Sequence, residues 1–312
     1  MVGGTGFIGR HVVAELLRRG HRVSVLSRNE GTQIPGADLL RGDAETLDQE
    51  EWAKLLTGHD SAVFAAGRDD RTVPRAPAAP YFHQGNVAPI ERLAAAAGQR
   101  VQFRSLVVIG SYFTAIARQR PQLALGQGHP YIRSRIEQAA AARRAAGPYL
   151  PVAVLEIPWV FGASLGRSSL FASTAPMMRS RLPLFAPPGG TAAVPVQTVA
   201  QAAVAALEGG QAGDFPIAAQ NVTWAWLIER MALAAGRPGP VRVRHLPKQL
   251  LHAAMAGAGW RHRLRRTEPG LTPRLSGPLL TSELFVDTAV CRNVLGVEPG
   301  DLNEAIRETF SP

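Results

Sequence analysis

The sequence predicts an α/β fold, with a doubly wound parallel sheet in the first half of the chain and a smaller, mostly C-terminal second domain. Two observations support this prediction. Short apolar runs alternate with amphipathic helical runs at the spacing of strand–helix–strand units. Beyond residue 158 the alternation loosens, and proline and glycine become frequent. A chain of 312 residues can hold one large domain or two coupled ones.

The elements of the first half follow in order. Four runs rich in valine, isoleucine and leucine are expected to form buried strands: HRVSVLS (21–27), DSAVFAAG (60–67), RSLVVIGS (104–111) and LPVAVLEI (150–157). Four amphipathic runs are expected to form helices, several of them ending on glycine, which favours a left-handed C-cap: residues 9–20, 46–58, 86–98 and 131–147.

One stretch of the second half is expected to return to the sheet. A helical run at 193–210 and a strand-like run at 214–220 continue the pattern of the first half. The main domain is therefore predicted at 1–160 with a return at about 191–220, and the smaller domain at 161–190 and 221–312.

Composition limits the classes of protein that the chain can belong to. The hydrophobic fraction is 46%, which predicts a packed core, and no apolar stretch is long enough to span a bilayer. The first residues lack the basic and apolar regions of a signal peptide. The single cysteine, Cys291, excludes an intrachain disulfide and fits a reducing compartment. We therefore expect a cytoplasmic protein.

The net charge of +10 raises the question of an anionic partner. Lysine occurs only at Lys54 and Lys248, and every other basic residue is arginine, a bias typical of base composition acting on surface positions. The densest basic run, residues 260–274, has no accompanying nucleic-acid motif. We expect a small-molecule substrate, no nucleic-acid partner, no membrane partner and no metal site, and we leave a homodimer open.

A glycine-rich loop opens the chain. In GGTGFIG, the glycines Gly3, Gly6 and Gly9 lie directly before an amphipathic helix, with Phe7 and Ile8 between the last two. Gly3 would allow a tight turn, Gly6 a close approach to a pyrophosphate, and Gly9 close packing of helix on sheet. The alternative is a plain strand-to-helix turn, but the second strand follows at the right distance, so we expect dinucleotide binding.

Only Met1 and Val2 precede this loop, whereas a strand normally needs about five residues. We therefore expect further residues upstream of Met1 to belong to the protein; otherwise the innermost strand is a stub.

The end of the second strand bears on the choice of cofactor. Enzymes that bind NAD usually carry an acid here, about 20 residues past the glycines, whereas this chain reads Ser27, Arg28 and Asn29. A guanidinium and a hydroxyl would hold a 2′-phosphate that a carboxylate would repel. NADP(H) is therefore expected over NAD(H), although Arg28 is also one arginine among many. Asp43, followed by Ala44, could contact the adenine or could be a turn residue.

Further motifs occur in a fixed order along the chain: GDAETLDQEEW, FAAG (64–67), NVAPIERLAAAA, VVIGSYF, YIRSRIEQA, LEIPWVFG and FVDTAVCRNVLGVEP. With the glycine loop, their order and spacing resemble the extended short-chain dehydrogenase/reductases. This family includes NAD(P)-dependent epimerases, dehydratases, 3β-hydroxysteroid-type dehydrogenases and dihydroflavonol-type ketoreductases. The resemblance covers nearly the whole chain and implies a Rossmann fold with a smaller substrate-binding domain.

The resemblance also implies roles for individual residues. Ser111 would hydrogen-bond the substrate oxygen, Tyr131 would transfer the proton, and Asn86 would help to hold a water-linked relay. As alternatives, Ser111 could simply end a strand, Asn86 could cap a helix, and Tyr131 could lie on a helix surface. The expected cofactor contacts are Gly3, Gly6, Phe7, Ile8, Gly9, Ser27, Arg28, Asn29, Asp43, Ala44, Ala65, Ala66, Gly67, Tyr131, Arg135 and Pro158.

Three positions depart from the family pattern. Gly110 stands where a second serine or threonine is common, and Glu156 stands where an arginine is usual. Arg135 replaces the lysine of Tyr-x-x-x-Lys. Positions 131 and 135 share a helix face, so both side chains can reach one ligand. Arginine keeps the positive charge but cannot release a proton.

These observations favour an NADPH-dependent ketoreductase acting on a small aromatic or hydrophobic substrate. A nucleotide-sugar epimerase or dehydratase is the alternative enzyme. The non-enzymatic alternative is a protein that binds and senses dinucleotides without catalysis. Arg135 in place of lysine is evidence for this alternative, and the presence of Ser111 and Tyr131 is evidence against it.

Overall fold

The computed structural model describes residues 1–28, 34–163 and 171–311. Its main sheet is parallel and runs in the order β2, β1, Val2, β3, β4, β5, β9. Val2 makes single parallel bridges to Leu26 on one side and Phe64 on the other, so it joins the two parts of the sheet. The strands are β1 (Ser24–Ser27), β2 (Asp38–Arg41), β3 (Ser61–Phe64), β4 (Ser105–Ile109), β5 (Val152–Glu156) and β9 (Gly213–Pro216).

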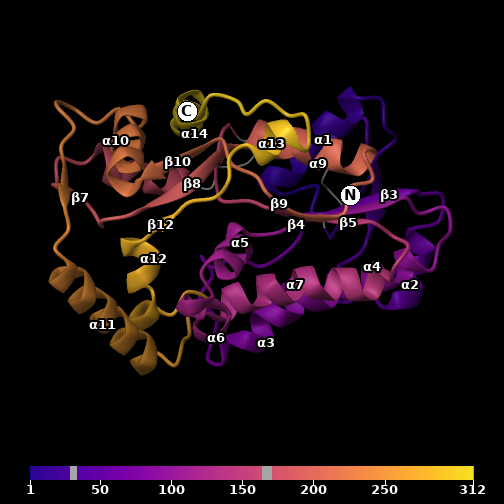
Figure 1. Cartoon of the computed structure of the whole chain (residues 1–312), viewed down its shortest axis with the longest axis horizontal. Helices are drawn as coiled ribbons and strands as arrows, with labels where there is room; N and C mark the ends of the chain where they lie inside the picture. The colour runs from indigo at the N-terminus through magenta and orange to yellow at the C-terminus, as the bar shows by residue number, and fades with distance from the viewer. Residues whose placement is uncertain (29–33, 164–170, 312) are drawn as a thin grey trace.

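Helices cover both faces of this sheet (Figure 1). On one face lie α1 (Phe7–Arg18) and α9 (Val196–Glu208), whose valines and alanines pack against the strands. On the other lie α2 (Gln49–Leu55), α4 (Ala88–Gly98) and α7 (Pro130–Ala146). The doubly wound α/β fold predicted from the sequence is confirmed, and each of the four predicted strands and four predicted helices has its counterpart.

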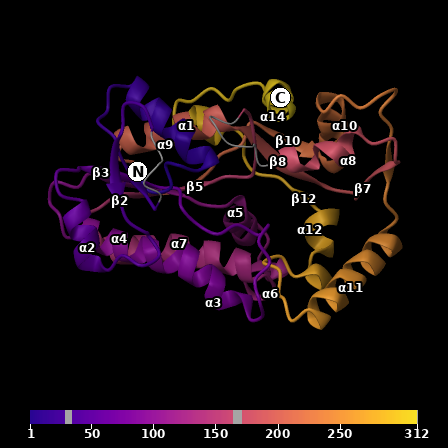
Figure 2. The same ribbon diagram turned by 180° about the vertical axis from the view of Figure 1, so that it is seen from behind.

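A second, smaller group of elements is built mainly from the C-terminal half (Figure 2). Its sheet has the order β10, β8, β12, with β6 also paired to β8, while β7 pairs with β11. The strands are β6 (Trp159–Phe161), β7 (Leu184–Ala186), β8 (Gly190–Pro195), β10 (Gln220–Thr223), β11 (Val243–His245) and β12 (Glu283–Leu284). The helices are α8 (Ala175–Arg179), α10 (Trp224–Ala234), α11 (Lys248–Leu264), α12 (Gly277–Thr281) and α14 (Leu302–Phe310). The short helix α13 (Val290–Asn293) instead packs beside β9, and its Cys291 belongs to the core under the main sheet. The chain returns to the main sheet through α9 and β9, since β8 lies in the second sheet.

Several short elements position the site. These are α3 (Ala78–Phe82), the π-helix η1 (His83–Val87), α5 (Tyr112–Gln119), the 3₁₀ turn η2 (Pro121–Leu123) and α6 (Leu125–Gly128). Two further 3₁₀ turns, η3 (Ala172–Thr174) and η4 (Pro273–Leu275), belong to the second group. Within the described ranges, no helix is long and apolar enough to cross a membrane.

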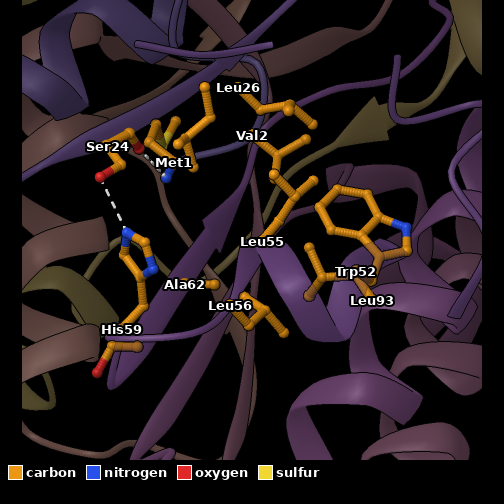
Figure 3. A pocket seen from close by; sticks show the side chains of 12 residues that line it. Met1, Val2, Ser24, Leu26, Trp52, Leu55, Leu56, His59, Ala62 and Leu93 are labelled. Carbon is orange, nitrogen blue, oxygen red and sulfur yellow. Dashed lines mark hydrogen bonds between the residues drawn. The ribbon is translucent and has the colours of Figure 1, made fainter. Parts of the chain in front are cut away.

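A small cavity of about 30 Å³ lies at the edge of the main sheet where its strands begin (Figure 3). The Met1 amino group donates to the Ser24 carbonyl at 2.6 Å, and His59 Nε2 lies 2.9 Å from Ser24 Oγ. Apolar side chains of α2 and α4, among them Trp52 and Leu93, line it together with residues of the strands such as Leu26 and Ala62. Ligands of open α/β sheets bind at the opposite edge, beyond the carboxyl ends of the strands, so this cavity is a gap in the packing.

Candidate active site

Two adjoining cavities lie at the carboxyl edge of the main sheet. The first, about 480 Å³, is the glycine-loop cavity; it is lined by Gly3 and Gly6, the end of β1 and the Asp43 loop. The second, about 440 Å³, is the tyrosine cavity; it contains Tyr131. Both are lined by Gly6, Phe7, Ala65, Ala66, Gly67 and Arg71. Their shared wall makes them two ends of one cleft.

The glycine loop forms a cradle that larger residues would fill. Gly3 has φ +80°, and a Cβ there would lie 2.7 Å from the backbone of Ala65. A Cβ on Gly9 would lie 2.0 Å from the Gly3 carbonyl oxygen. Gly6, the N-cap of α1, supplies no side-chain cap to the helix. The first amide groups of α1 are thus suited to an anion such as a pyrophosphate, and the residues fit the dinucleotide that the sequence predicts.

The end of β1 forms the far side of the glycine-loop cavity. Ser27 is buried, and its carbonyl accepts a hydrogen bond from Gly42 at 3.1 Å. Arg28 is 71% exposed, and its guanidinium lies 3.9 Å from the Asp43 carboxylate. Asp43 also accepts a hydrogen bond from the Glu45 amide at 3.0 Å, an Asx turn that presents Ala44 to the cavity. Asn29 lies outside the described residues.

Ser111 and Tyr131 meet in the tyrosine cavity. Ser111 lies two residues beyond the end of β4 and caps α5, where its hydroxyl accepts from the Phe113 amide at a long 3.4 Å. Tyr131 is in the first turn of α7, with its ring edge-on to Phe82 and Phe113 at 5.7 and 6.5 Å between centroids. Burial raises the pKa of Tyr131; the Arg135 charge and a hydrogen bond with Ser111 lower that pKa, while Asp70 raises it. Tyr131 is therefore biased towards its protonated form.

Arg135 lies one helical turn from Tyr131 and is buried. Its Cζ is 6.0 Å from the centre of the Tyr131 ring, and Nη2 donates to the Ile109 carbonyl at 2.6 Å. Among the described residues, its Nε is buried without a hydrogen-bond partner. A buried guanidinium donor without a partner is costly, and a sugar hydroxyl in the cavity would satisfy it. This second observation also fits a bound dinucleotide.

Asn86 lies behind these residues, in the π-helix η1, and orders two neighbouring segments. Its amide oxygen accepts from the Arg68 amide at 2.6 Å, and its amide nitrogen donates to the Arg68 carbonyl at 3.0 Å. The same nitrogen donates to Ser134 Oγ at 2.9 Å, which in turn donates to the Tyr131 carbonyl at 2.7 Å. Asn86 thus ties the loop after β3 to the first turn of α7.

The other two departures from the family pattern have structural causes. A Cβ on Gly110 would lie 2.8 Å from Val154 Cγ1, so a serine or threonine would collide with β5. Glu156 is fully buried and accepts two hydrogen bonds from Arg118, at 2.6 and 2.8 Å. Asp214 lies 3.4 Å from Arg118 and also pairs with Arg143. Neither Glu156 nor Arg118 lines the tyrosine cavity.

The structure adds three residues to those predicted from the sequence: Asp69, Asp70 and Arg71 follow β3 and line the tyrosine cavity. Pro158, which was predicted, lines the same cavity from the β5–β6 connection. The run GRDDR directly after a buried strand was the available signal, because that position meets the ligand in a doubly wound fold. The apolar lining is formed by Phe113, Trp159, Phe171 and Leu271.

Comparison with known proteins agrees with this geometry. Residues 3–156 match the family described as NAD(P)H-binding. The crystal structure of gox2253 superposes with a TM-score of 0.78 at 20% identity, over 99% of this chain and 95% of that one. Human epimerase family protein SDR39U1 with NADPH superposes with a TM-score of 0.69 at 19% identity, over 99% and 97% of the two chains. The first half of the chain therefore matches an NAD(P)H-binding family, and the whole chain has the Rossmann-like fold of these structures, as the resemblance in its motifs implies.

A curated ketoreductase matches about half of the chain. A ketoreductase of Stigmatella aurantiaca, named for 4-hydroxy-2-methyl-3-oxo-4-farnesyl-3,4-dihydroquinoline-1-oxide, is 30% identical over 177 residues. These residues are 52% of this chain and 50% of the relative. The chain spans half or less of the length of the curated relatives that it matches.

Proposed function

We propose that the protein is an NADPH-dependent ketoreductase that reduces the carbonyl of a small aromatic or hydrophobic substrate. The observation that carries this proposal is the joint presence of Ser111, Tyr131 and Arg135 in one cavity that also has aromatic residues in its lining and that adjoins the glycine loop. The Stigmatella relative supports it, since its name describes a ring ketone with an apolar chain.

Each side chain has a distinct task in this reaction. NADPH, when bound, would supply a hydride to the carbonyl carbon. Ser111 donates a hydrogen bond to the carbonyl oxygen and orients it. Tyr131 donates the proton to the same oxygen as charge develops there, which is general acid catalysis. Arg135 stabilises the tyrosinate left behind by its charge, and its unpartnered Nε is available to a ribose hydroxyl.

The remaining contacts hold this arrangement. Asn86 and Ser134 fix the turn of α7 that carries Tyr131, and Pro158 shapes the cavity wall. Ala65, Ala66 and Gly67 form the shared wall along which a dinucleotide would extend. Gly67 has φ +155°, and a Cβ there would lie 2.7 Å from Asn86 Oδ1. A side chain at position 67 would therefore disturb Asn86.

The arginine at position 135 favours reduction over epimerisation or dehydration. An epimerase must take a proton and return it within one turnover, and a lysine can join such a relay. Arginine holds its protons at any working pH. UDP-glucose 4-epimerase of Thermotoga maritima shares the fold at 16% identity, so UDP-glucose belongs in any substrate panel.

Preference for NADPH rests on Arg28 and Ser27 at the end of β1. In the Arg28→Ala variant, loss of a charge-assisted contact with the 2′-phosphate should weaken NADPH binding by roughly 1.5–3 kcal/mol and leave NADH binding unchanged. Fluorescence titration of wild type and variant with both reduced cofactors measures this. Tighter binding of NADH by wild type, or an unchanged preference in the variant, would contradict it.

The reaction itself is tested by following NADPH oxidation with aryl ketones, steroid ketones and UDP-glucose. With a ketone that is turned over, Tyr131→Phe should lower kcat about 10²-fold or more while NADPH binds as before. Near-normal turnover by this variant would show that Tyr131 is not the acid. Binding of NADPH without turnover of any ketone would favour the sensing alternative.

A further inference from the structure

Two neighbouring carboxylates line the tyrosine cavity but differ in their partners. Asp69 accepts from Arg71 Nε at 2.8 Å and from the Arg71 amide at 3.0 Å. Asp70 has no cationic side chain within 4.0 Å among the described residues. Asp70 is partly buried, and only its own amide and the charge of Arg71 stabilise its carboxylate, so a donor on a ligand in the cavity would have an acceptor there.

The position of Asp70 separates it from the cofactor groups. Arg71 lines both cavities, whereas Asp69 and Asp70 line only the tyrosine cavity. A free carboxylate beside anionic phosphates would repel them, and Asp70 avoids the cavity where they would lie. Asp70 instead lines the tyrosine cavity together with Tyr131 and Tyr112, so it lies at the end of the cleft where the carbonyl is reduced. Burial, and then the charge of Asp70, raise the pKa of both tyrosines.

Much of the remaining lining of the cavity is apolar. Trp159 is stacked on Phe171, with centroids 4.9 Å apart and ring planes at 3°, and Phe113 and Leu271 also belong to this lining. Such a surface favours a flat or apolar body and gives it no hydrogen bond. The cavity thus combines an apolar wall with one carboxylate that only accepts hydrogen bonds.

We propose that Asp70 is the specificity-determining residue of the tyrosine cavity, and that the substrate is an aromatic or apolar ketone bearing a hydroxyl or protonated amine that donates to the Asp70 carboxylate. This inference rests on the proposed reductase function for the identity of the reacting group. Burial raises the pKa of Asp70, which is the effect expected of a carboxylate whose partner is supplied by a ligand.

The test compares five ketones that differ in one substituent: acetophenone, its 3′- and 4′-hydroxy derivatives, and its 3′- and 4′-aminomethyl derivatives. For wild type, kcat/KM should be about 10-fold or more higher with the best donor-bearing ketone than with acetophenone. Asp70→Asn should reduce this ratio to near one. Asp69→Asn is the matched control and should keep the ratio, because Asp69 already has its partner in Arg71.

If kcat/KM rises above that of acetophenone only with the aminomethyl ketones, the substrate is cationic. If it rises with the hydroxy and the aminomethyl ketones, a hydroxyl donor is sufficient. The inference is overturned if wild type shows no preference, or if Asp69→Asn and Asp70→Asn lose it equally. Calorimetric titration of the NADPH complex of Tyr131→Phe with the same ketones separates binding from chemistry. If binding follows Asp70 but no ketone is reduced by wild type, the reductase function fails and the assignment of Asp70 stands.

Discussion

Replacing Arg135 with methionine removes the charge that faces Tyr131 and keeps most of the side-chain volume. The guanidinium carbon lies 6.0 Å from the centre of the Tyr131 ring. With an effective dielectric constant of about 20, a unit charge at this distance stabilises a tyrosinate by roughly 3 kcal/mol. Its loss should raise the pKa of Tyr131, because the Arg135 charge is the largest influence that lowers this pKa.

The two directions of the reaction should respond differently. Ketone reduction uses protonated Tyr131 as the acid, whereas oxidation of the product alcohol uses the tyrosinate as the base. At neutral pH, roughly 3 kcal/mol corresponds to about a 100-fold loss of tyrosinate, so oxidation by Arg135→Met should fall about 100-fold. Reduction should fall less, since the protonated form is retained.

The assay is kcat/KM in both directions as a function of pH, at a saturating cofactor concentration fixed by separate titration. The separate titration is needed because the Nε of Arg135 is a buried donor available to the cofactor. Equal losses in both directions, with unchanged pH profiles, would refute the electrostatic argument. Arg135 would then act only through its hydrogen bond to Ile109 and through the cofactor.

Three further predictions concern stability and the cofactor cradle. Arg118→Ala leaves the fully buried Glu156 without its main partner and should destabilise the fold by roughly 3 kcal/mol in urea unfolding, and adding Glu156→Gln should recover part of that loss. Burial lowers the pKa of His129 to about 4, below its unfolded value of 6.5, so the unfolded state binds the extra proton and stability should fall as pH drops from 6.5 to 4. The His129→Asn side chain can still accept a hydrogen bond from the Thr272 amide. In this variant the free energy of unfolding should differ between pH 7 and pH 4.5 by roughly 2–3 kcal/mol less than in wild type. Gly9→Ala should abolish tight NADPH binding, because its Cβ would overlap the Gly3 carbonyl, whereas Gly257→Ala, with open space around it, should leave binding unchanged.

The main fold was predictable from the sequence because its buried strands are continuous apolar runs. β4 is SLVVI and β5 is VAVLE, and both are buried at every position. The edge strand β2 was missed as a defined element, since DLLR is mostly exposed and exists only through its pairing with β1. Pairing between distant backbones leaves no periodic trace in so short a segment.

The site was predictable where a side chain has a fixed place in a motif, and less so where its role depends on a neighbour. Ser111, Tyr131 and Arg135 could be selected by order and spacing. The run GRDDR has the appearance of a solvated charge cluster, and only the fold distinguishes the paired Asp69 from Asp70. The sequence likewise marked Glu156 as a departure, but its partner Arg118 is 38 residues away and is brought to it by α5.

Arg135→Lys separates charge from proton transfer at position 135. Lysine keeps the positive charge near Tyr131 and can release a proton to become neutral, which arginine cannot do at a working pH. If the natural enzyme is limited to one proton donation per turnover, reduction should change little, whereas alcohol oxidation, which must pass a proton away from Tyr131, should become faster. The ratio of oxidation to reduction rates, together with the solvent deuterium isotope effect in each direction, measures this. If both rates fall in proportion in this variant, the guanidinium is needed for the hydrogen bonds that it donates to the Ile109 carbonyl and to a ligand in the cleft. Arginine would then be required at position 135 for the geometry of its donors.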